Sequence, residues 1–164
     1  MTREEYIRVT GRMRDNPGRI RLVKAVNRVL TGGVFVTYPL FLLLLFLEKR
    51  PFLSRAVMVP AVSFAAVSLF RKVADVPRPY EKYGVPPVLD KDTKGKSFPS
   101  RHVFSAFIIA VTVFRQYPAA GLLLAAAGTA LGWIRVAGGV HEPRDVVAGA
   151  AAGVICGVAG YYLF

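Results

Sequence analysis

Cysteine and histidine are both scarce in this chain of 164 residues, which has one thiol, Cys156, and two imidazoles, His102 and His141. A single cysteine excludes an intramolecular disulfide. Its place in an apolar run indicates a buried thiol that packs as a small hydrophobic residue. Any reaction that depends on histidine must therefore use His102, His141 or both.

Acidic residues are also few. The chain has 10 Asp and Glu and 22 Lys and Arg, which gives it a net charge of +12. A basic chain can bind nucleic acid, but Tyr6 is the one aromatic residue in the basic segment 1–30, which therefore lacks stacking side chains. The apolar content of 54% exceeds the roughly 45–50% of soluble domains. We therefore expect a one-domain membrane protein with basic loops and no nucleic-acid partner.

Five uncharged apolar runs follow the first 30 residues and indicate membrane spans. They occupy residues 31–47, 56–70, 103–114, 119–134 and 146–164. The expected fold is an all-α integral membrane helical bundle of about five transmembrane helices over 31–164. The fifth run carries glycines at a spacing of four, which favours close helix packing inside the bundle. The same spacing occurs at dimer interfaces, so the oligomeric state stays open.

Apolar residues recur at helical spacing near the end of segment 1–30, with basic residues on the other faces. These apolar residues are Ile20, Val23, Val26 and Leu30. The pattern predicts an amphipathic helix in the headgroup plane of an anionic membrane, although a solvated charged segment has a similar composition. With five spans, segment 1–30 and the loops 71–101 and 135–145 share one side, which holds 18 of the 22 basic residues. The excess predicts a cytoplasmic N-terminus and cytoplasmic polar loops.

Three polar motifs interrupt the apolar runs, and both histidines lie within them. They read Arg71-x6-Arg78-Pro79, Pro99-Ser100-Arg101-His102 and Arg135-x5-His141-x3-Asp145. Guanidinium groups match phosphate oxygens in two-point contacts, and a helix start favours an anion. A histidine near a carboxylate can be held in one tautomer, which leaves its other nitrogen free to react. The combination predicts phosphate-ester hydrolysis at a membrane surface.

Each of these residues also has a simpler interpretation. Asp145 could simply be the cap of a helix, and Arg71 and Lys72 could simply anchor a span at the interface, without any role in catalysis. Two histidines and one aspartate could ligate zinc, but four arginines would oppose a cation. We therefore expect no metal and no cofactor.

Together the motifs resemble the signature of the type 2 phosphatidic acid phosphatase superfamily, Lys-x6-Arg-Pro, Pro-Ser-Gly-His and Ser-Arg-x5-His-x3-Asp. The resemblance covers about half of the chain. It implies that His141 is the nucleophile that forms a phosphohistidine, that Asp145 orients it, and that His102 is the acid for the leaving group. It also implies that four further groups bind phosphoryl oxygens with the backbone near residue 101. These are Arg71, Arg78, Ser100 and Arg135.

The chain departs from this signature at three positions. Arg71 replaces the lysine, and neighbouring Lys72 could serve in its place. Arg101 replaces the glycine and adds a charge that could contact the substrate, and Ile134 replaces a serine. Members of the superfamily typically have six spans, so the resemblance implies that the N-terminal segment stands in place of the first.

The predicted function is a metal-independent membrane lipid phosphate phosphatase that acts on a phosphatidate-like lipid. Polyprenyl (undecaprenyl-type) diphosphates and polyprenyl sugar phosphates are alternative substrates. A vanadate-dependent haloperoxidase, which resembles the same superfamily, is more distant because those enzymes are soluble. A non-catalytic anion-binding membrane protein or transporter is a third class.

Overall fold

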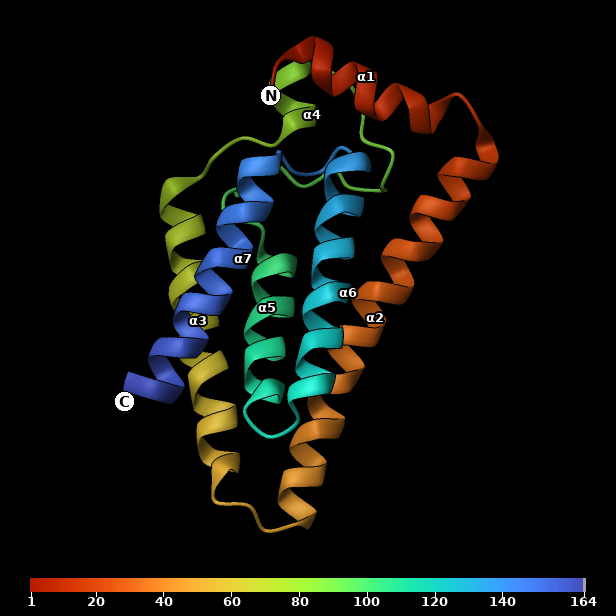
Figure 1. The fold of residues 1–164 in the computed structure, drawn as a ribbon. Helices are drawn as coiled ribbons and strands as arrows, with labels where there is room; N and C mark the ends of the chain where they lie inside the picture. Colours follow the sequence, from red (N-terminus) through yellow and green to blue (C-terminus); the bar gives the residue numbers. More distant parts are fainter. Residues whose placement is uncertain (164) are drawn as a thin grey trace.

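Long apolar helices build this protein, whose computed structural model describes residues 1–163. Within that range the chain forms α-helices followed by one short π-helix, with no strand (Figure 1). The helices are α1 (Arg3–Arg14), α2 (Pro17–Leu47), α3 (Phe52–Ala74), α4 (Pro79–Tyr83), α5 (Arg101–Phe114), α6 (Pro118–Ala137) and α7 (Pro143–Val158), with the π-helix at Ala159–Leu163. The predicted all-α class is confirmed.

Four segments of the described chain are long and apolar enough to cross a membrane. They contain α2, α3, α6, and α7 with its π-helical continuation. The remaining predicted span, residues 103–114, corresponds to α5, which has 14 residues and so extends about 21 Å, less than the roughly 30 Å hydrocarbon core of a bilayer. It lies at the centre of the bundle, between α6 and α7, and nine of its residues are buried (Figure 1). Because its surroundings are protein, its length need not match the bilayer.

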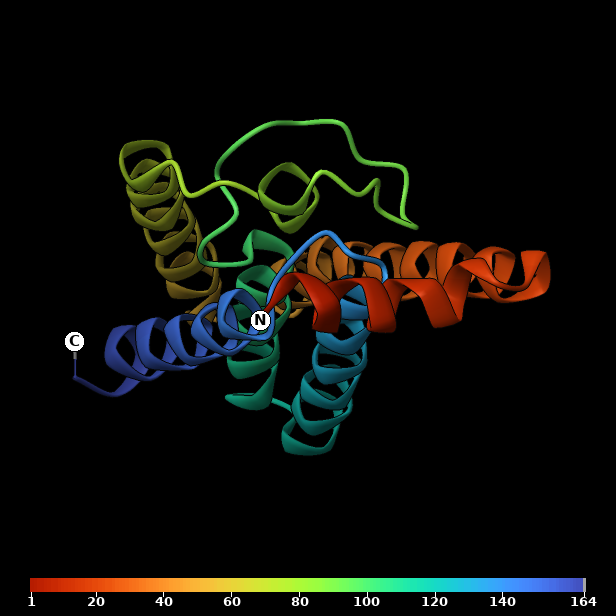
Figure 2. The ribbon, with the colours of Figure 1, turned by 90° about the horizontal axis from the view of Figure 1, so that it is seen from above.

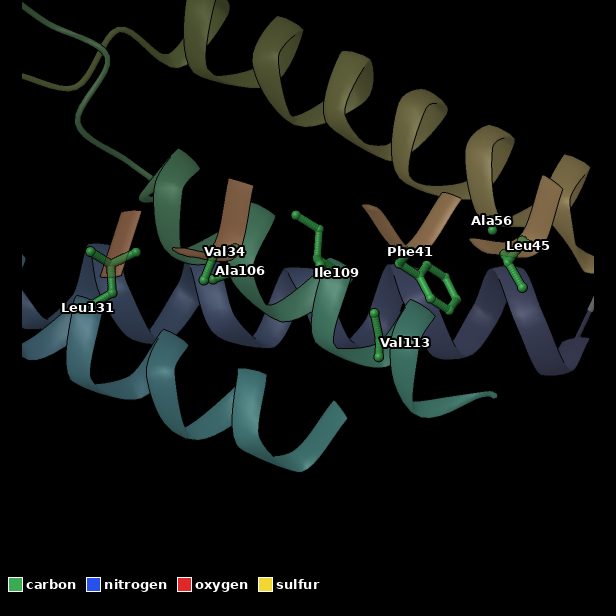
Figure 3. Packing of buried hydrophobic residues seen from close by; sticks show 8 residues of the cluster. All are labelled: Val34, Phe41, Leu45, Ala56, Ala106, Ile109, Val113 and Leu131. Atoms are coloured by element: carbon green, nitrogen blue, oxygen red, sulfur yellow. The ribbon is translucent and has the colours of Figure 1, made fainter. Parts of the chain in front are cut away.

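The apolar core joins α2 and α5 to their neighbours. Figure 3 shows the side chains that meet there: Val34, Phe41 and Leu45 of α2, Ala56 of α3, Ala106, Ile109 and Val113 of α5, and Leu131 of α6. Other large apolar side chains of the spans point outwards, among them Leu47, Leu69 and Leu123. An outer surface of this kind suits contact with lipid tails.

The N-terminal segment differs from its expected arrangement. Helix α2 runs without a break from Pro17, so the predicted interfacial helix and the first span form one helix of 31 residues, and the expected boundary near residue 30 falls inside it. The break comes earlier, where the Asn16 side chain accepts a hydrogen bond from Gly18 N at 2.7 Å and Pro17 begins the helix. An N-cap and a proline at the first helical position start a helix, whereas residue 30 has no such signal.

Helix α1 lies across one end of the bundle, over the loops that carry the polar motifs (Figure 1). Tyr6 is fully buried, and its hydroxyl lies 3.1 Å from the carbonyl oxygen of Gly139 and 3.2 Å from that of Val85. Gly139 has a φ of 75°, and a Cβ there would meet the Tyr6 hydroxyl at 2.7 Å. Helix α1 therefore packs on the loop that precedes His141.

Helices α5 and α7 approach closely through the glycines of α7. A Cβ on Gly149 would lie 2.6 Å from the carbonyl oxygen of Ser100, and a Cβ on Gly153 would lie 2.7 Å from that of Phe104. The glycine spacing thus serves packing inside the bundle. It brings the start of α5 against the start of α7, where Ser100 N donates to Asp145 O at 2.8 Å.

The polar motifs gather at the end of the bundle that α1 covers. Helix α4 and the loops on either side of it lie there with the α6–α7 loop, opposite the α2–α3 and α5–α6 connections (Figure 1). Seen from above, the long loop before α5 passes over this end (Figure 2). The fold therefore places the three motifs at one end of the bundle, on the common side that the number of apolar runs predicted.

Candidate active site

A buried group of three side chains, Ser97, His141 and Asp145, forms the centre of the site. Oδ2 of Asp145 accepts a hydrogen bond from Ser97 Oγ at 2.6 Å and lies 3.4 Å from Nδ1 of His141. All three residues are at most 2% exposed. A carboxylate can only accept, so we assign the imidazole proton to Nδ1. The other ring nitrogen, Nε2, then has a free lone pair.

The start of α7 positions this carboxylate. Glu142 caps the helix and Pro143 begins it, so Asp145 occupies the third helical position and is not the N-cap. Its Oδ2 accepts a hydrogen bond from Glu142 N at 3.0 Å. Capping and contact with His141 therefore use the same oxygen, which explains why the carboxylate stands four residues after the histidine.

His141 is an uncharged imidazole at neutral pH. Burial is the main cause that lowers its pKa, to about 4, and the charges of Arg78 and Arg135 lower it further, while Asp145 acts in the opposite direction. The neutral ring is the form that can attack phosphorus.

Arg71 supports the loop that enters α5. Its guanidinium donates to the carbonyl oxygens of Lys96, Ser97 and Pro99, and the contact with Ser97 measures 3.0 Å. Arg71 is 6% exposed, whereas Lys72 is exposed. Of the two residues that could fill the first basic position, Arg71 is therefore the one that reaches the site.

Arg78 connects the first motif to the third. Its Nε donates to Gly95 O at 3.1 Å, and a terminal nitrogen donates to Val140 O at 3.2 Å. The arginine therefore holds the residue before His141 and adds positive charge beside it.

Two buried donors of the second and third motifs remain unpaired. Ser100 Oγ and Arg135 Nε find no hydrogen-bond partner within residues 1–163, and the two residues are 0% and 7% exposed. Buried polar groups are costly unless they are paired. Two donors beside an uncharged imidazole suit an oxyanion, which would accept from both and offset the charge of the arginines.

His102 lies in the first turn of α5. It lines two cavities. One, of about 460 Å³, also contains Arg135 and Val140, the neighbour of His141. The other, of about 160 Å³, is lined by Phe35, Phe64, Arg101 and Ser105. The larger cavity therefore joins His102 to Arg135 and to the residue that precedes His141.

Arg101 differs from the other predicted arginines because it is exposed. Its guanidinium carbon lies 5.5 Å from the centre of the Phe64 ring, over its face. Arg71, Arg78 and Arg135 are buried, so Arg101 stands at the side of the site that opens towards α3.

Sequence reasoning missed Ser97. The serine lies outside the three motifs and its bonds reach across 44 and 48 residues, to His141 and Asp145. Its one local signal is its position three residues before Ser100 in a polar loop.

Lys82 and Tyr83 were also missed. They contact Oε1 of the buried Glu142 at 3.2 and 3.0 Å and so support the start of α7.

We expect Ser97→Ala to lower kcat/KM for phosphate release by about 10- to 100-fold. The change removes a short hydrogen bond to a carboxylate, worth about 1.5–3 kcal/mol, and leaves Asp145 less well oriented. Ser54→Ala is the matched control, because Ser54 is exposed and lies at the opposite end of the bundle. Equal activity of the two variants would rule out a positioning role for Ser97.

Comparisons with known proteins agree with this arrangement. The family model described as the PAP2 superfamily matches residues 52–164, which include all three motifs, and the predicted recognition is thereby confirmed. This chain belongs to the PAP2 superfamily. No curated protein matches it.

Two solved structures share the fold. LpxE of Aquifex aeolicus is 23% identical, with 96% of this chain and 92% of that chain covered and a TM-score of 0.72. A transmembrane PAP2 type phosphatidylglycerolphosphate phosphatase from Bacillus subtilis is 18% identical to this chain. The match covers 88% of this chain and 76% of that chain, with a TM-score of 0.64. At these identities the likeness concerns the fold.

Proposed function

We propose that this protein is a membrane lipid phosphate phosphatase that hydrolyses a phosphomonoester or diphosphate of a lipid through a phosphohistidine intermediate. The buried hydrogen-bonded group of Ser97, Asp145 and His141, next to the unpaired donors of Ser100 and Arg135, carries the proposal. Membership of the PAP2 superfamily supports it, as does the fold shared with a phosphatidylglycerolphosphate phosphatase.

The reaction has two steps. Nε2 of His141 attacks phosphorus, the bond from phosphorus to the leaving oxygen breaks, and His102 gives that oxygen a proton. His102 then takes a proton from water, the water oxygen attacks phosphorus, and the bond to Nε2 breaks to release inorganic phosphate. Arg78, Arg135 and Ser100 stabilise the charge on the phosphoryl oxygens in both steps.

An apolar cavity accounts for the lipid part of the substrate. It has a volume of about 310 Å³ and lies between α2, α3 and α5, where Tyr38, Leu42 and Val57 line it. It shares Phe35, Phe64 and Ser105 with the smaller cavity that reaches His102. A lipid chain can therefore lie between these helices while its phosphate meets the histidines.

Phosphate release from a panel of lipid phosphates, measured on purified protein in detergent with and without EDTA, tests the function. We expect release from at least one phosphatidate-like or polyprenyl lipid, with the same rate in the chelator because no step uses a metal. Release from none of them would refute the function. Release that stops in EDTA and returns with added metal would refute metal independence, and oxidation of halide with vanadate and peroxide would favour the haloperoxidase class.

We also propose that the site faces the cytoplasm. The end that carries it holds 18 basic residues, and four lie at or near the other end: Lys49, Arg50, Arg55 and Arg115. Such an excess favours the cytoplasmic side. In a background without Cys156, an impermeant maleimide should label Lys49→Cys on intact cells and Asp92→Cys only after lysis. The reverse pattern would place the site outside.

A further inference from the structure

The cavity of about 460 Å³ beside His102 is strongly basic. It lies between the first half of α2, the loop before α5 and the end of α6, and its lining includes Lys24, Arg28, Lys91 and Arg135. One carboxylate, Asp90, also lines it and pairs with Lys24 at 2.6 Å. Four cations against one carboxylate leave the cavity with a net positive charge.

Lys91 shows how little of this charge is compensated. Burial lowers its pKa, and the charges of Arg78, Arg135 and Arg101 lower it further, while Asp92 alone opposes them. An added cation is therefore disfavoured at this point and an anion favoured. The same potential acts on a ligand in the cavity.

The cavity also contains polar atoms that lack partners. Asn27 Oδ1 and Thr31 Oγ1 are buried and, in the part of the chain that the structure describes, make no hydrogen bond. Both residues belong to the cavity lining, as does Arg135, whose Nε is likewise unpaired. Unpaired polar groups around a cavity of this size favour a polar ligand.

His102 separates this basic cavity from the apolar one. It lines the basic cavity with Arg135, and it lines the small cavity whose residues Phe35 and Phe64 continue into the apolar cavity. In the proposed reaction His102 protonates the leaving oxygen, so the leaving group lies next to it. That leaving group then has access to a basic cavity on one side and an apolar one on the other.

We propose that the leaving group carries a negative charge of its own, which binds in the basic cavity near Arg28 and Lys91 while its apolar chain lies between α2, α3 and α5. The inference rests on the proposed function and narrows its substrate class. It selects lipid diphosphates, whose leaving group is a lipid monophosphate, and lipids with a phosphodiester beside the terminal phosphate. A phosphatidate is a poorer substrate, because its leaving group is neutral.

Two pairs of lipids test this inference, each differing in the charge of the leaving group. Because farnesyl phosphate is also a better leaving group than farnesol, the second pair tests the inference through the change of its ratio in the variants. Didecanoyl phosphatidate is compared with didecanoyl phosphatidylglycerol phosphate, and farnesyl phosphate with farnesyl diphosphate. We expect kcat/KM to be at least about tenfold higher for the anionic leaving group in each pair, since one ion pair in a partly buried site can supply that factor. In Arg28→Gln and Lys91→Gln this ratio should fall by about fivefold or more.

Arg21→Gln and Lys94→Gln are the matched controls, because both residues are exposed on the same two elements and lie outside the cavity lining. They should keep the wild-type ratio. A ratio measured on one protein sample does not depend on how much of the sample is folded, so partial misfolding of a variant cannot mimic the effect.

A wild-type ratio near one in both pairs would overturn the inference, as would a ratio that Arg28→Gln and Lys91→Gln leave unchanged. Failure of the proposed function looks different, because then none of the four lipids releases phosphate. Hydrolysis of all four at equal rates would retain the phosphatase and reject the anionic leaving group.

Discussion

Replacement of His141 by alanine is expected to abolish phosphate release, with kcat lower by at least about 10⁴-fold. Loss of a nucleophile costs about 10⁶-fold in well-studied hydrolases, and His141 is the histidine whose Nδ1 contacts Asp145, which leaves its Nε2 free to attack. His102 cannot replace it, because His102 lies on α5, whereas His141 lies in the α6–α7 loop, where its ring is within 3.4 Å of Asp145. The measurement is phosphate release per molecule of purified protein in detergent.

A labelled intermediate separates a lost nucleophile from a damaged fold. Wild-type protein mixed with ³²P-labelled lipid phosphate and quenched in alkali should retain protein-bound label, since phosphohistidine is stable to base. His141→Ala should retain none while it elutes as the wild type does in gel filtration. Label on His141→Ala, or phosphate release at a wild-type rate, would remove His141 from the reaction and favour the transporter class.

Replacement of His102 by alanine is expected to lower kcat for lipid phosphates by about 10²- to 10⁴-fold, the range typical of a general acid. A lipid alkoxide is a poor leaving group and needs the proton that His102 supplies. p-Nitrophenolate leaves without one, so the loss with p-nitrophenyl phosphate should be at least about tenfold smaller.

This dependence on the leaving group distinguishes an acid from a packing residue. The His102 ring packs edge-on against Phe35, with their centres 6.2 Å apart, so alanine could also disturb α2. Such a disturbance would slow both substrates equally, and equal losses would contradict the acid role. His141→Ala is the internal comparison, because loss of the nucleophile should abolish the hydrolysis of both.

The general arrangement of this protein was predictable because its signals are local. Uncharged runs long enough for a membrane predict helices whatever their partners are, and their number places segment 1–30 and both polar loops on one side. Periodicity says less about where a helix begins. The start of α2 at Pro17 depended on the Asn16 cap, and the apolar pattern from Ile20 onwards continued through residue 30 without a break.

The candidate site was predictable where its residues lie close in sequence. His141 and Asp145 are four residues apart, and their spacing alone indicated contact between ring and carboxylate. Ser97 had no such signal, because its partner follows 48 residues later. The role of Arg71 was equally hidden. A positive charge at the position of the signature's lysine suggested a phosphate ligand, but the guanidinium of Arg71 also donates to three backbone carbonyls of the loop that carries Ser97.

By itself, the sequence determined the class of this protein: an all-helical membrane bundle with arginines, two histidines and an aspartate at one end. Spacing and composition are properties of the chain alone, and they were sufficient for that conclusion. Only the tertiary structure decided that Ser97 reaches Asp145 and that His102 separates a basic cavity from an apolar one. Both facts depend on how closely α5 approaches α7 and α2, and such distances between helices follow from packing rather than from sequence spacing.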